Sequence, residues 1–301
     1  MSEAQPDQPL AGQVAIVTGG GKGLGRAFSL HLAELGAAVV VNNRNRQVDE
    51  NGLGPADHVV AEIQAAGGRA VAHHGDVADP ATAASLVEDA TRHFGRLDIC
   101  VTSAAINPLE MLHKSSPETF RHVMDVNVTG TALVVAAASA AMRPAGHGRI
   151  IVVASGAGLH GELAAAAYAA SKGAVIALAR TAAFEGAPKG VLTNVLLPYA
   201  LTQMTTDGIA PEQAERLRPE LVAPVIGALA DPACVVNGQV VVAAGSAVRA
   251  VDVVEHATVA HPPGRLDPRD LEDLLDRSRE GEPHTYSSAQ EAFQSLLADL
   301  A

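Results

Sequence analysis

A tyrosine and a lysine stand one helical turn apart in the sequence, as Tyr168 and Lys172. The stretch around them, residues 163–184, is rich in alanine and predicts a helix, on which positions i and i+4 share a face. An ammonium beside a phenol lowers the tyrosine pKa, so the pair could donate and accept a proton. A surface tyrosine beside a solvated lysine shows the same spacing, and the pair alone does not decide between the two interpretations.

A glycine-rich turn lies near the start of the chain. Residues 13–18 are apolar and β-branched, the sequence GGGKGLG follows at 19–25, and residues 26–35 have a helical pattern. Glycines let the backbone approach a pyrophosphate, and the helix N-terminus offers free N–H groups. A strand, a glycine turn and a helix in this order predict a dinucleotide site, with a ligand-free loop as the alternative.

The end of the second predicted strand, 37–41, bears on which dinucleotide fits. An acidic side chain there would bond the ribose 2′-hydroxyl of NAD and repel the 2′-phosphate of NADP. The first acid is Asp49, whereas Lys22, Arg44 and Arg46 are cationic. Arginine can bind phosphate through two hydrogen bonds. We therefore expect NADP(H) to be favoured over NAD(H), with solvated loop cations as the alternative.

Further strands are expected at 70–74, 97–102, 149–154, 191–197 and 238–243, with helices between them. This alternation predicts an α/β fold with a Rossmann-type, doubly wound, seven-stranded parallel sheet over residues 10–250. Residues 251–301 are expected to add a strand and two helices as an extension of the same unit. Ser155 follows the fifth strand, at the edge where ligands bind in such sheets.

Two polar residues stand where their side chains need a partner or a purpose. Asn127 lies inside a long apolar helix expected at 117–142. Its amide would be costly there unless it bonds the backbone, bends the helix or holds a water. Asp76 follows the third strand and could contact an adenine or cap the next helix, which Asp79 and Pro80 begin.

The composition excludes several classes of function. The formal net charge is −12 with no basic stripe, so we expect no nucleic-acid partner. Cys100 and Cys234 lie in apolar surroundings and indicate buried thiols in a reducing compartment. The histidines lack metal-ligand spacing, so no metal is expected. The N-terminus does not resemble a signal peptide and no uninterrupted apolar run reaches membrane-spanning length, which favours a cytoplasmic protein with no membrane partner.

Taken together, these residues resemble the short-chain dehydrogenase/reductase family over residues 10–250. The family's cofactor motif matches 18–25, and its catalytic tetrad matches Asn127, Ser155, Tyr168 and Lys172 in order and spacing. The resemblance implies an NAD(P)(H)-dependent oxidoreductase that interconverts a secondary alcohol and a ketone by hydride transfer. The implied cofactor contacts are Thr18, Gly19, Lys22, Gly23, Leu24, Gly25, Asn43, Arg44, Asp76, Val77, Ser103, Ala104, Tyr168, Lys172, Pro198 and Thr202.

The resemblance also implies a role for each member of the tetrad. Tyr168 would give a proton to the developing alkoxide, and Ser155 would orient the carbonyl. Lys172 would lower the pKa of Tyr168 and hold the nicotinamide ribose. Asn127 would hold a water that relays protons between Lys172 and solvent. An epimerase or dehydratase on the same scaffold, or a cofactor-binding protein without activity, are the alternatives.

Within the family, the chain is most similar to the group of (3R)-hydroxyacyl-CoA dehydrogenases found in peroxisomal multifunctional enzymes of type 2. The likeness rests on residues 39–42, the insertion at 47–55, residues 221–224 and the tail after 248. It implies a small-molecule substrate that is bulky and hydrophobic, or an acyl-thioester 3-hydroxy or 3-keto compound. The family usually forms oligomers, and the small residues at 164–170 permit close helix packing, so a homodimer or homotetramer is expected.

Three departures from the family pattern stand out. The usual Asn-Asn-Ala-Gly after the fourth strand is replaced by residues 102–105 (TSAA), so that Ala105 adds a methyl group where the backbone would meet the cofactor. The usual Pro-Gly after the sixth strand is Pro198-Tyr199. Asn43 stands where the most similar group has an acid that selects NAD, which agrees with the NADP(H) expectation.

Overall fold

The computed structural model describes residues 8–44, 47–201, 211–261, 263–264 and 266–300. Its contacts divide the chain into two compact units, Met1–Ala250 and Val251–Ala301. Each unit is considered by itself. The expectation that the extension belongs to one unit with the rest stays a prediction.

Eight strands of the described chain form one sheet, in the order β3-β2-β1-β4-β5-β6-β7-β8. Strands β1 to β7 pair in parallel. Strand β8 returns after a two-residue turn and runs antiparallel at the edge. The predicted α/β fold with a doubly wound parallel sheet is confirmed. The strands are β1 Val14–Thr18, β2 Ala38–Asn42, β3 Arg69–His73, β4 Ile99–Thr102, β5 Gly148–Val153, β6 Val191–Tyr199, β7 Val240–Ala244 and β8 Ala247–Val251.

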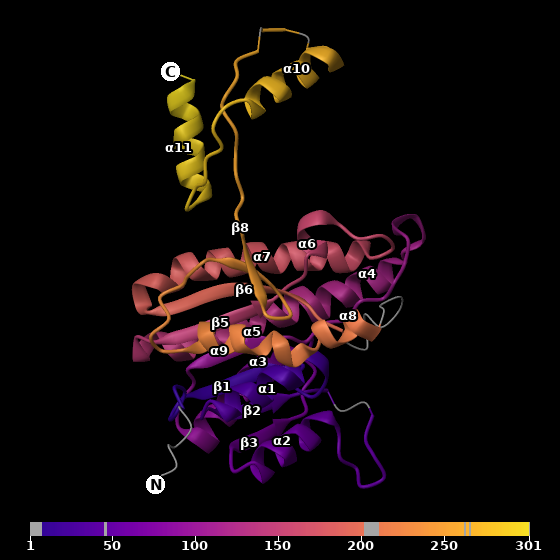
Figure 1. The fold of residues 1–301 in the computed structure, drawn as a ribbon, viewed down its shortest axis with the longest axis vertical. Coiled ribbons are helices and arrows are strands. Elements are labelled where there is room, and N and C mark those ends of the chain that lie inside the picture. Colours follow the sequence, from indigo (N-terminus) through magenta and orange to yellow (C-terminus); the bar gives the residue numbers. More distant parts are fainter. Residues whose placement is uncertain (1–7, 45–46, 202–210, 262, 265, 301) are drawn as a thin grey trace. The chain divides into compact units, whose positions relative to one another are not determined.

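Helices cover both faces of the sheet (Figure 1). Helices α1, α2 and α9 pack on one face, and α3, α5 and α7 pack on the other. The bounds are α1 Gly23–Glu34, α2 Pro55–Ala65, α3 Pro80–Phe94, α4 Pro117–Met124, α5 Thr131–Met142, α6 Ala157–His160, α7 Ala166–Gly186, α8 Pro211–Arg216, α9 Ala223–Ala230, α10 Pro268–Arg279 and α11 Ala289–Asp299. This covering explains why the strands are apolar throughout rather than alternating.

The order of the strands opens a crevice at one edge of the sheet. All five residues of β1 and of β2 are buried, which holds the centre of the sheet in place. The strand order reverses between β1 and β4, and ligands bind outside the carboxyl ends of the strands at such a point. Thr18 and Thr102 are paired across these two strands, so the loops that follow them begin side by side.

The long helix expected at 117–142 is interrupted by a π-helical turn, Asp125–Gly130, between α4 and α5. Taken as one helix, Pro117–Ala145 is long and apolar enough to cross a membrane by length and composition. Polar residues such as Asn127, Thr129 and Ser139 interrupt this stretch, so it does not contradict the expectation that no uninterrupted apolar run reaches that length. The helix serves as a core element of this fold, because Val134, Ala138 and Met142 are at most 2% exposed and α5 packs on β4 and β5.

The second unit is built on two capped helices. Asp267 accepts hydrogen bonds from the backbone N–H groups of Arg269 and Asp270 at the start of α10. Ser288 accepts from the backbone N–H of Glu291 at the start of α11. Neither α10 nor α11 has a fully buried residue. The strand expected within residues 251–301 corresponds to β8, which lies at Ala247–Val251 and ends where that range begins.

Candidate active site

The turn after β1 forms a cradle that only glycine permits. Gly19 has a φ of +65°, and a Cβ on it would lie 2.8 Å from the backbone N and Cα of Ala104. A Cβ on Gly25 would lie 2.2 Å from the carbonyl oxygen of Gly19. The N-cap residue of α1, Lys22, makes no side-chain cap hydrogen bond, which leaves the helix N-terminus available. This cradle fits the pyrophosphate of a dinucleotide.

At the far end of the cavity, Arg44 and Asp76 form an ion pair. Arg44 Nη1 lies 3.2 Å from Asp76 Oδ2, and each side chain is 29% exposed. The other carboxylate oxygen of Asp76 accepts from the backbone N–H of Ala78, while Asp79 caps α3. Asp49 bonds within its own turn and pairs with His58, and it does not line the cavity. Asp76, and not Asp49, is therefore the acidic residue next to Arg44 in this cavity.

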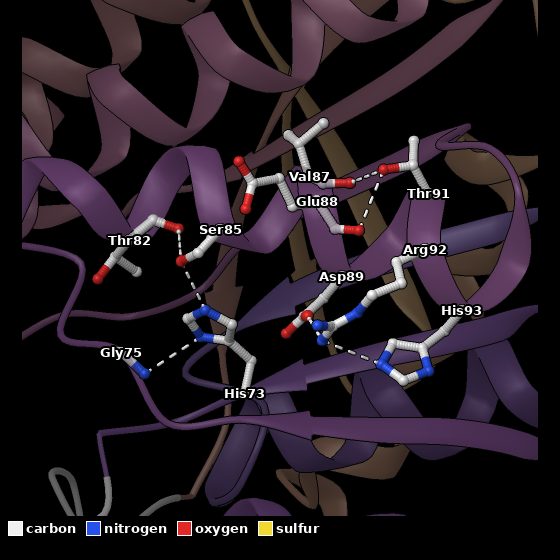
Figure 2. A network of polar contacts seen from close by, with 10 residues as sticks. All are labelled: His73, Gly75, Thr82, Ser85, Val87, Glu88, Asp89, Thr91, Arg92 and His93. Atoms are coloured by element: carbon white, nitrogen blue, oxygen red, sulfur yellow. Dashed lines mark hydrogen bonds and ion pairs between the residues drawn. The ribbon is translucent and has the colours of Figure 1, made fainter.

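The buried His73 contacts Gly75, the residue that precedes Asp76 (Figure 2). Its Nδ1 accepts from the backbone N–H of Gly75 at 3.1 Å, so the proton of the neutral ring is on Nε2, which lies 2.8 Å from Ser85 Oγ. Ser85 in turn donates to the carbonyl of Thr82. Asn42 Nδ2 contacts His73 Nδ1 and donates to the carbonyl of Gly75. Burial is the main cause that lowers the pKa of His73.

Tyr168 and Lys172 do lie on one face of α7, turned toward Ser155 at the end of β5. Lys172 is 4% exposed, and its Nζ donates to the carbonyl oxygen of Val153 at 2.9 Å. The same Nζ lies 5.6 Å from the centre of the Tyr168 ring. Ser155 Oγ accepts from the backbone N–H of Ala157, so its own proton remains to be donated.

Burial governs the ionisation of this pair. It raises the pKa of Tyr168, and a hydrogen bond with Ser155 partly opposes that shift. It lowers the pKa of Lys172 to about 8. The net shift of the Tyr168 pKa in the chain alone is upward, with burial as its largest cause. The expected effect of Lys172 on that pKa stays a prediction.

The amide of Asn127 is fully engaged within the π-helical turn. Its Oδ1 accepts from the backbone N–H of Ile106, and its Nδ2 donates to the carbonyl of Ile106, both at 2.9 Å. The remaining Nδ2 hydrogen reaches Ser171 Oγ at 3.0 Å. Of the three uses that the sequence allowed for this side chain, the structure shows hydrogen bonding to the backbone. Asn127 thereby ties the loop after β4 to the helix that carries Tyr168.

One cavity of about 890 Å³ brings most of the predicted residues together. Its lining includes Gly19, Lys22, Gly23, Leu24, Gly25, Asn43, Arg44, Asp76, Val77, Ser103, Ala104, Ser155, Tyr168, Lys172 and Pro198. Thr18 and Asn127 are buried behind the wall, at 2% and 0% exposure. Thr202 and Arg46 lie outside the described residues.

The cavity also has an apolar rim beyond the predicted catalytic and cofactor-binding residues. Leu109 and Leu163 line it and are 71% and 76% exposed. Their two loops are joined by a bridge in which the backbone N–H of Glu110 donates to the carbonyl of Ala164 at 2.7 Å. Ala164 has a φ of +56°, a strained conformation for a residue with a side chain. Leu109 follows β4 closely in the sequence. That position could have indicated that it lies at the ligand-binding edge of the sheet.

The departures from the family pattern lie at the cavity wall. Ala105 lines the cavity, but its φ is not positive, so its methyl group causes no backbone strain. Tyr199 also lines the cavity and is half-exposed. Among the residues that the structure describes, no group of three or more His, Cys, Asp or Glu side chains could hold a metal ion.

Comparison with known proteins places this geometry in a family. Residues 13–213 match the short chain dehydrogenase family. Hydroxyacyl-CoA dehydrogenase ChsB1 of Mycobacterium tuberculosis is 39% identical over 257 residues, which cover 80% of each chain. Peroxisomal multifunctional enzyme type 2 of Drosophila melanogaster is 38% identical over 268 residues, or 88% of this chain and 44% of that enzyme, so this chain spans less than half its length.

A solved structure agrees with these matches. A short chain dehydrogenase from Mycobacterium avium superposes with a TM-score of 0.79 at 33% identity, covering 92% of this chain and 98% of the other. The family match spans well over half of the chain and includes the glycine cradle, Ser155, Tyr168 and Lys172. The chain therefore belongs to the short-chain dehydrogenase family and is an oxidoreductase of that family.

Proposed function

We propose that this chain interconverts a secondary alcohol and a ketone by hydride transfer, with Tyr168 exchanging the proton. One observation carries the proposal: Ser155, Tyr168 and Lys172 line the same cavity as the glycine cradle. A nicotinamide cofactor bound in that cradle supplies or accepts the hydride. The residues of the chain then have to orient the carbonyl group and handle its proton.

The chemistry of each side chain supports its role. Because burial raises the pKa of Tyr168, the phenol is protonated at neutral pH and ready to act as the acid in ketone reduction. Ser155 has one O–H, which hydrogen-bonds Tyr168 in the chain alone and would turn to the carbonyl oxygen of a bound ketone to orient it. Lys172, with a pKa lowered to about 8, remains mostly charged at pH 7 and favours the anion that forms on Tyr168 when the proton leaves.

We infer that the substrate is a bulky hydrophobic or acyl-thioester 3-hydroxy or 3-keto compound. The rim of the cavity supports this inference, because Leu109 and Leu163 expose apolar surface beside it. The relative from Mycobacterium tuberculosis is named as a hydroxyacyl-CoA dehydrogenase, which points to the same chemistry. The bridge between the two rim loops holds this surface in place before a substrate arrives.

The preferred cofactor is NADP(H). Lys22 and Arg44 line the cavity, Asn43 replaces an acid at the end of β2, and Asp49 points elsewhere. Arg44 already pairs with Asp76, which holds its guanidinium at that end of the site. A lower dissociation constant for NADPH than for NADH, measured by titration of the purified chain, is expected. A tighter complex with NADH would overturn this preference.

The substitution Tyr168→Phe tests the mechanism. We expect a loss of at least about 100-fold in kcat for ketone reduction, because the proton donor is gone, while NADPH binding persists. The measurement is NADPH consumption with 3-oxoacyl thioesters and hydrophobic ketones. Tyr286→Phe is the matched control, since Tyr286 bonds Ser295 in the second unit and does not line the cavity.

Two outcomes would contradict the proposal in different ways. Near wild-type reduction by Tyr168→Phe would remove the tyrosine from the mechanism. Conversion of a substrate without net change in NADPH absorbance would instead indicate an epimerase or dehydratase on this scaffold, in which hydride leaves and returns.

We also propose that the chain is a homodimer or homotetramer, joined through α7. Part of the alanine-rich run expected to form the contact is in the core, because Ala165 and Ala167 are buried. The outer face of α7 instead exposes Ala170, Ala177 and Phe184, which are spaced seven residues apart on one stripe. Phe184 is 66% exposed, which is unusual for a large apolar side chain with no partner.

A further inference from the structure

The side chain of Tyr199 occupies the space that a Cβ atom on Gly156 would need. The φ of −56° and ψ of −26° of Gly156 are helical values that any residue adopts, so its backbone does not demand glycine. The three atoms nearest to a Cβ built on it all belong to Tyr199: the hydroxyl oxygen at 2.3 Å, Cζ at 3.1 Å and Cε1 at 3.9 Å. The phenol of Tyr199 therefore lies directly against the residue that follows Ser155.

Tyr199 is held there by the sheet. It is the last residue of β6 and is paired in register with Ala244 of β7. Side chains alternate along a strand, so Tyr199 shares the face of Leu197, on the side of the sheet where α7 packs on β6. Its backbone position is thus fixed, and its ring lines the cavity together with Ser155 and Tyr168.

The hydroxyl of Tyr199 is available to a ligand. No hydrogen bond joins it to any residue that the structure describes, although the cavity has many polar groups. The side chain is 50% exposed, so its ring presents both an apolar face and a polar tip to the cavity. A phenol in this setting can donate one hydrogen bond to an oxygen beside the reacting carbonyl.

We propose that Tyr199 is a substrate-positioning residue, whose hydroxyl binds a second oxygen of the substrate while Ser155 binds the reacting one. This inference rests on the proposed function, because it needs a ketone held at Ser155. The thioester carbonyl of a 3-oxoacyl compound is two carbons from the reacting carbonyl and is the oxygen that fits. Two neighbouring hydroxyl donors then distinguish such a substrate from a simple ketone.

A first experiment compares Tyr199→Phe with the unmodified chain on two substrates. One is a 3-oxoacyl thioester, and the other is a methyl ketone of equal chain length without the thioester carbonyl. We expect kcat/KM to fall about 10-fold for the thioester, mainly through KM, and less than about 2-fold for the ketone, since only the thioester loses a hydrogen bond. Equal effects on both substrates would overturn the positioning role.

A second experiment uses the contact with Gly156. In the unmodified chain, Gly156→Ala places a methyl group against the phenol and displaces it, so the same selective loss on the thioester is expected. In a Tyr199→Ala background the methyl group meets open space, and Gly156→Ala should change kcat/KM by less than about 2-fold. A loss of equal size in both backgrounds would show that Gly156 matters for some other reason and would contradict the proposal.

The measurements distinguish a failure of the proposed function from a failure of the positioning role of Tyr199. If the unmodified chain reduces neither substrate with either nicotinamide cofactor, the proposed function is wrong and the positioning role falls with it. If it reduces both and Tyr199→Phe is neutral, only the positioning role is overturned. Thermal unfolding of each variant shows whether a loss reflects the folded state, and Tyr199→Phe should unfold at the temperature of the unmodified chain.

Discussion

The charge on Lys172 is held in an environment that favours its loss. Lys172 is 4% exposed, and the one hydrogen bond of its ammonium within the described residues is to the carbonyl of Val153. Burial therefore lowers the pKa of Lys172 to about 8, while it raises the pKa of Tyr168. Both shifts favour neutral side chains in the chain alone. In the proposed mechanism, an anion that forms on Tyr168 would offset this cost.

Because burial of the charged lysine is costly, we expect Lys172→Met to change the stability of the folded chain. The pKa in the folded chain lies below the value of 10.5 in the unfolded chain, so at pH 7 the unfolded chain holds the proton more tightly. Replacing Lys172 with a neutral side chain of similar length should raise the free energy of unfolding at pH 7, by about 2 kcal/mol after the loss of one hydrogen bond. Activity should be lost.

The stability difference between Lys172→Met and the unmodified chain should depend on pH. The penalty is complete below about pH 8 and fades as pH rises toward 10.5, so the advantage of the variant should shrink over that range. Denaturant unfolding at pH 7, 8.5 and 9.5 measures it, with the exposed Lys189→Met as a control that should show no such trend. A variant less stable than the unmodified chain at pH 7 would mean that burial of this lysine is not costly.

At the scale of elements, the connection between β3 and α3 is an ordered part of the site. His73 ends β3, Gly75 and Asp76 form the turn, and Ser85 lies on α3 (Figure 2). A Cβ on Gly75 would lie 2.6 Å from both His73 Cε1 and Thr82 Oγ1, so the turn is closely packed. A neutral His73 is needed, because Nδ1 must accept from Gly75. The wall that carries Asp76 therefore depends on an unprotonated ring.

This dependence predicts a response to acid. Because burial lowers the pKa of His73 below 6.5, the unfolded chain gains this proton first as pH falls below 6.5, and stability decreases. Asp89 and His74 act on the ring with opposite signs. The variant His73→Asn keeps an acceptor near Nδ1 but cannot be protonated. The unmodified chain should lose stability relative to it between pH 7 and pH 5.

Urea unfolding across this pH range gives the difference directly. The exposed His93→Asn is the control, and its difference from the unmodified chain should stay constant as pH falls. The prediction is wrong if His73→Asn and the unmodified chain respond to acid in parallel.

The π-helical turn is a second element with a specific task. It lets Asn127 face the loop after β4, where its amide bonds both backbone groups of Ile106. Turns of this kind inside α-helices are rare and occur frequently at functional sites. The contact between Asn127 and Ser171 also fixes α7 relative to that loop. The loop that holds one wall of the cavity is thus coupled to the helix that holds Tyr168.

At the scale of the whole molecule, the site lies where the strand order of the first unit reverses. The loops after β1, β4 and β5 meet at one edge and line the cavity of about 890 Å³. The face of α7 turned away from the sheet exposes Ala170, Ala177 and Phe184, and we expect a second copy of the chain to cover it. An interface through α7 would brace the helix that carries Tyr168 and Lys172.

The oligomer prediction is tested with Phe184→Asp. A carboxylate in an apolar interface has no partner, so the variant should dissociate to a species of lower mass. Light scattering coupled to size-exclusion chromatography measures the mass, and Leu53→Asp, at a 42% exposed residue between β2 and α2, is the matched control. An unmodified chain that is already monomeric, or a variant of unchanged mass, would contradict the prediction.

The order of the chain alone determined the parallel sheet and most of the residues of the cavity. Apolar strands alternate with helices, and the connections between parallel strands have one hand, so the loops that carry Gly19, Ser103 and Ser155 had to meet at one edge. The spacing of Tyr168 and Lys172 placed both on one helix face for the same kind of reason. These are local rules, and they can be applied before the chain is folded.

Other features depend on contacts between residues far apart in the sequence, and only the tertiary structure decided them. The direction of the pKa shift of Tyr168 depends on its burial, and sequence spacing suggested the opposite direction. The use of the Asn127 amide depends on Ile106, and the contact of Tyr199 with Gly156 depends on where β6 ends. Desolvation and close packing act between segments that only the fold brings together, so Tyr168 and Lys172 could be found by spacing but not assigned their charges.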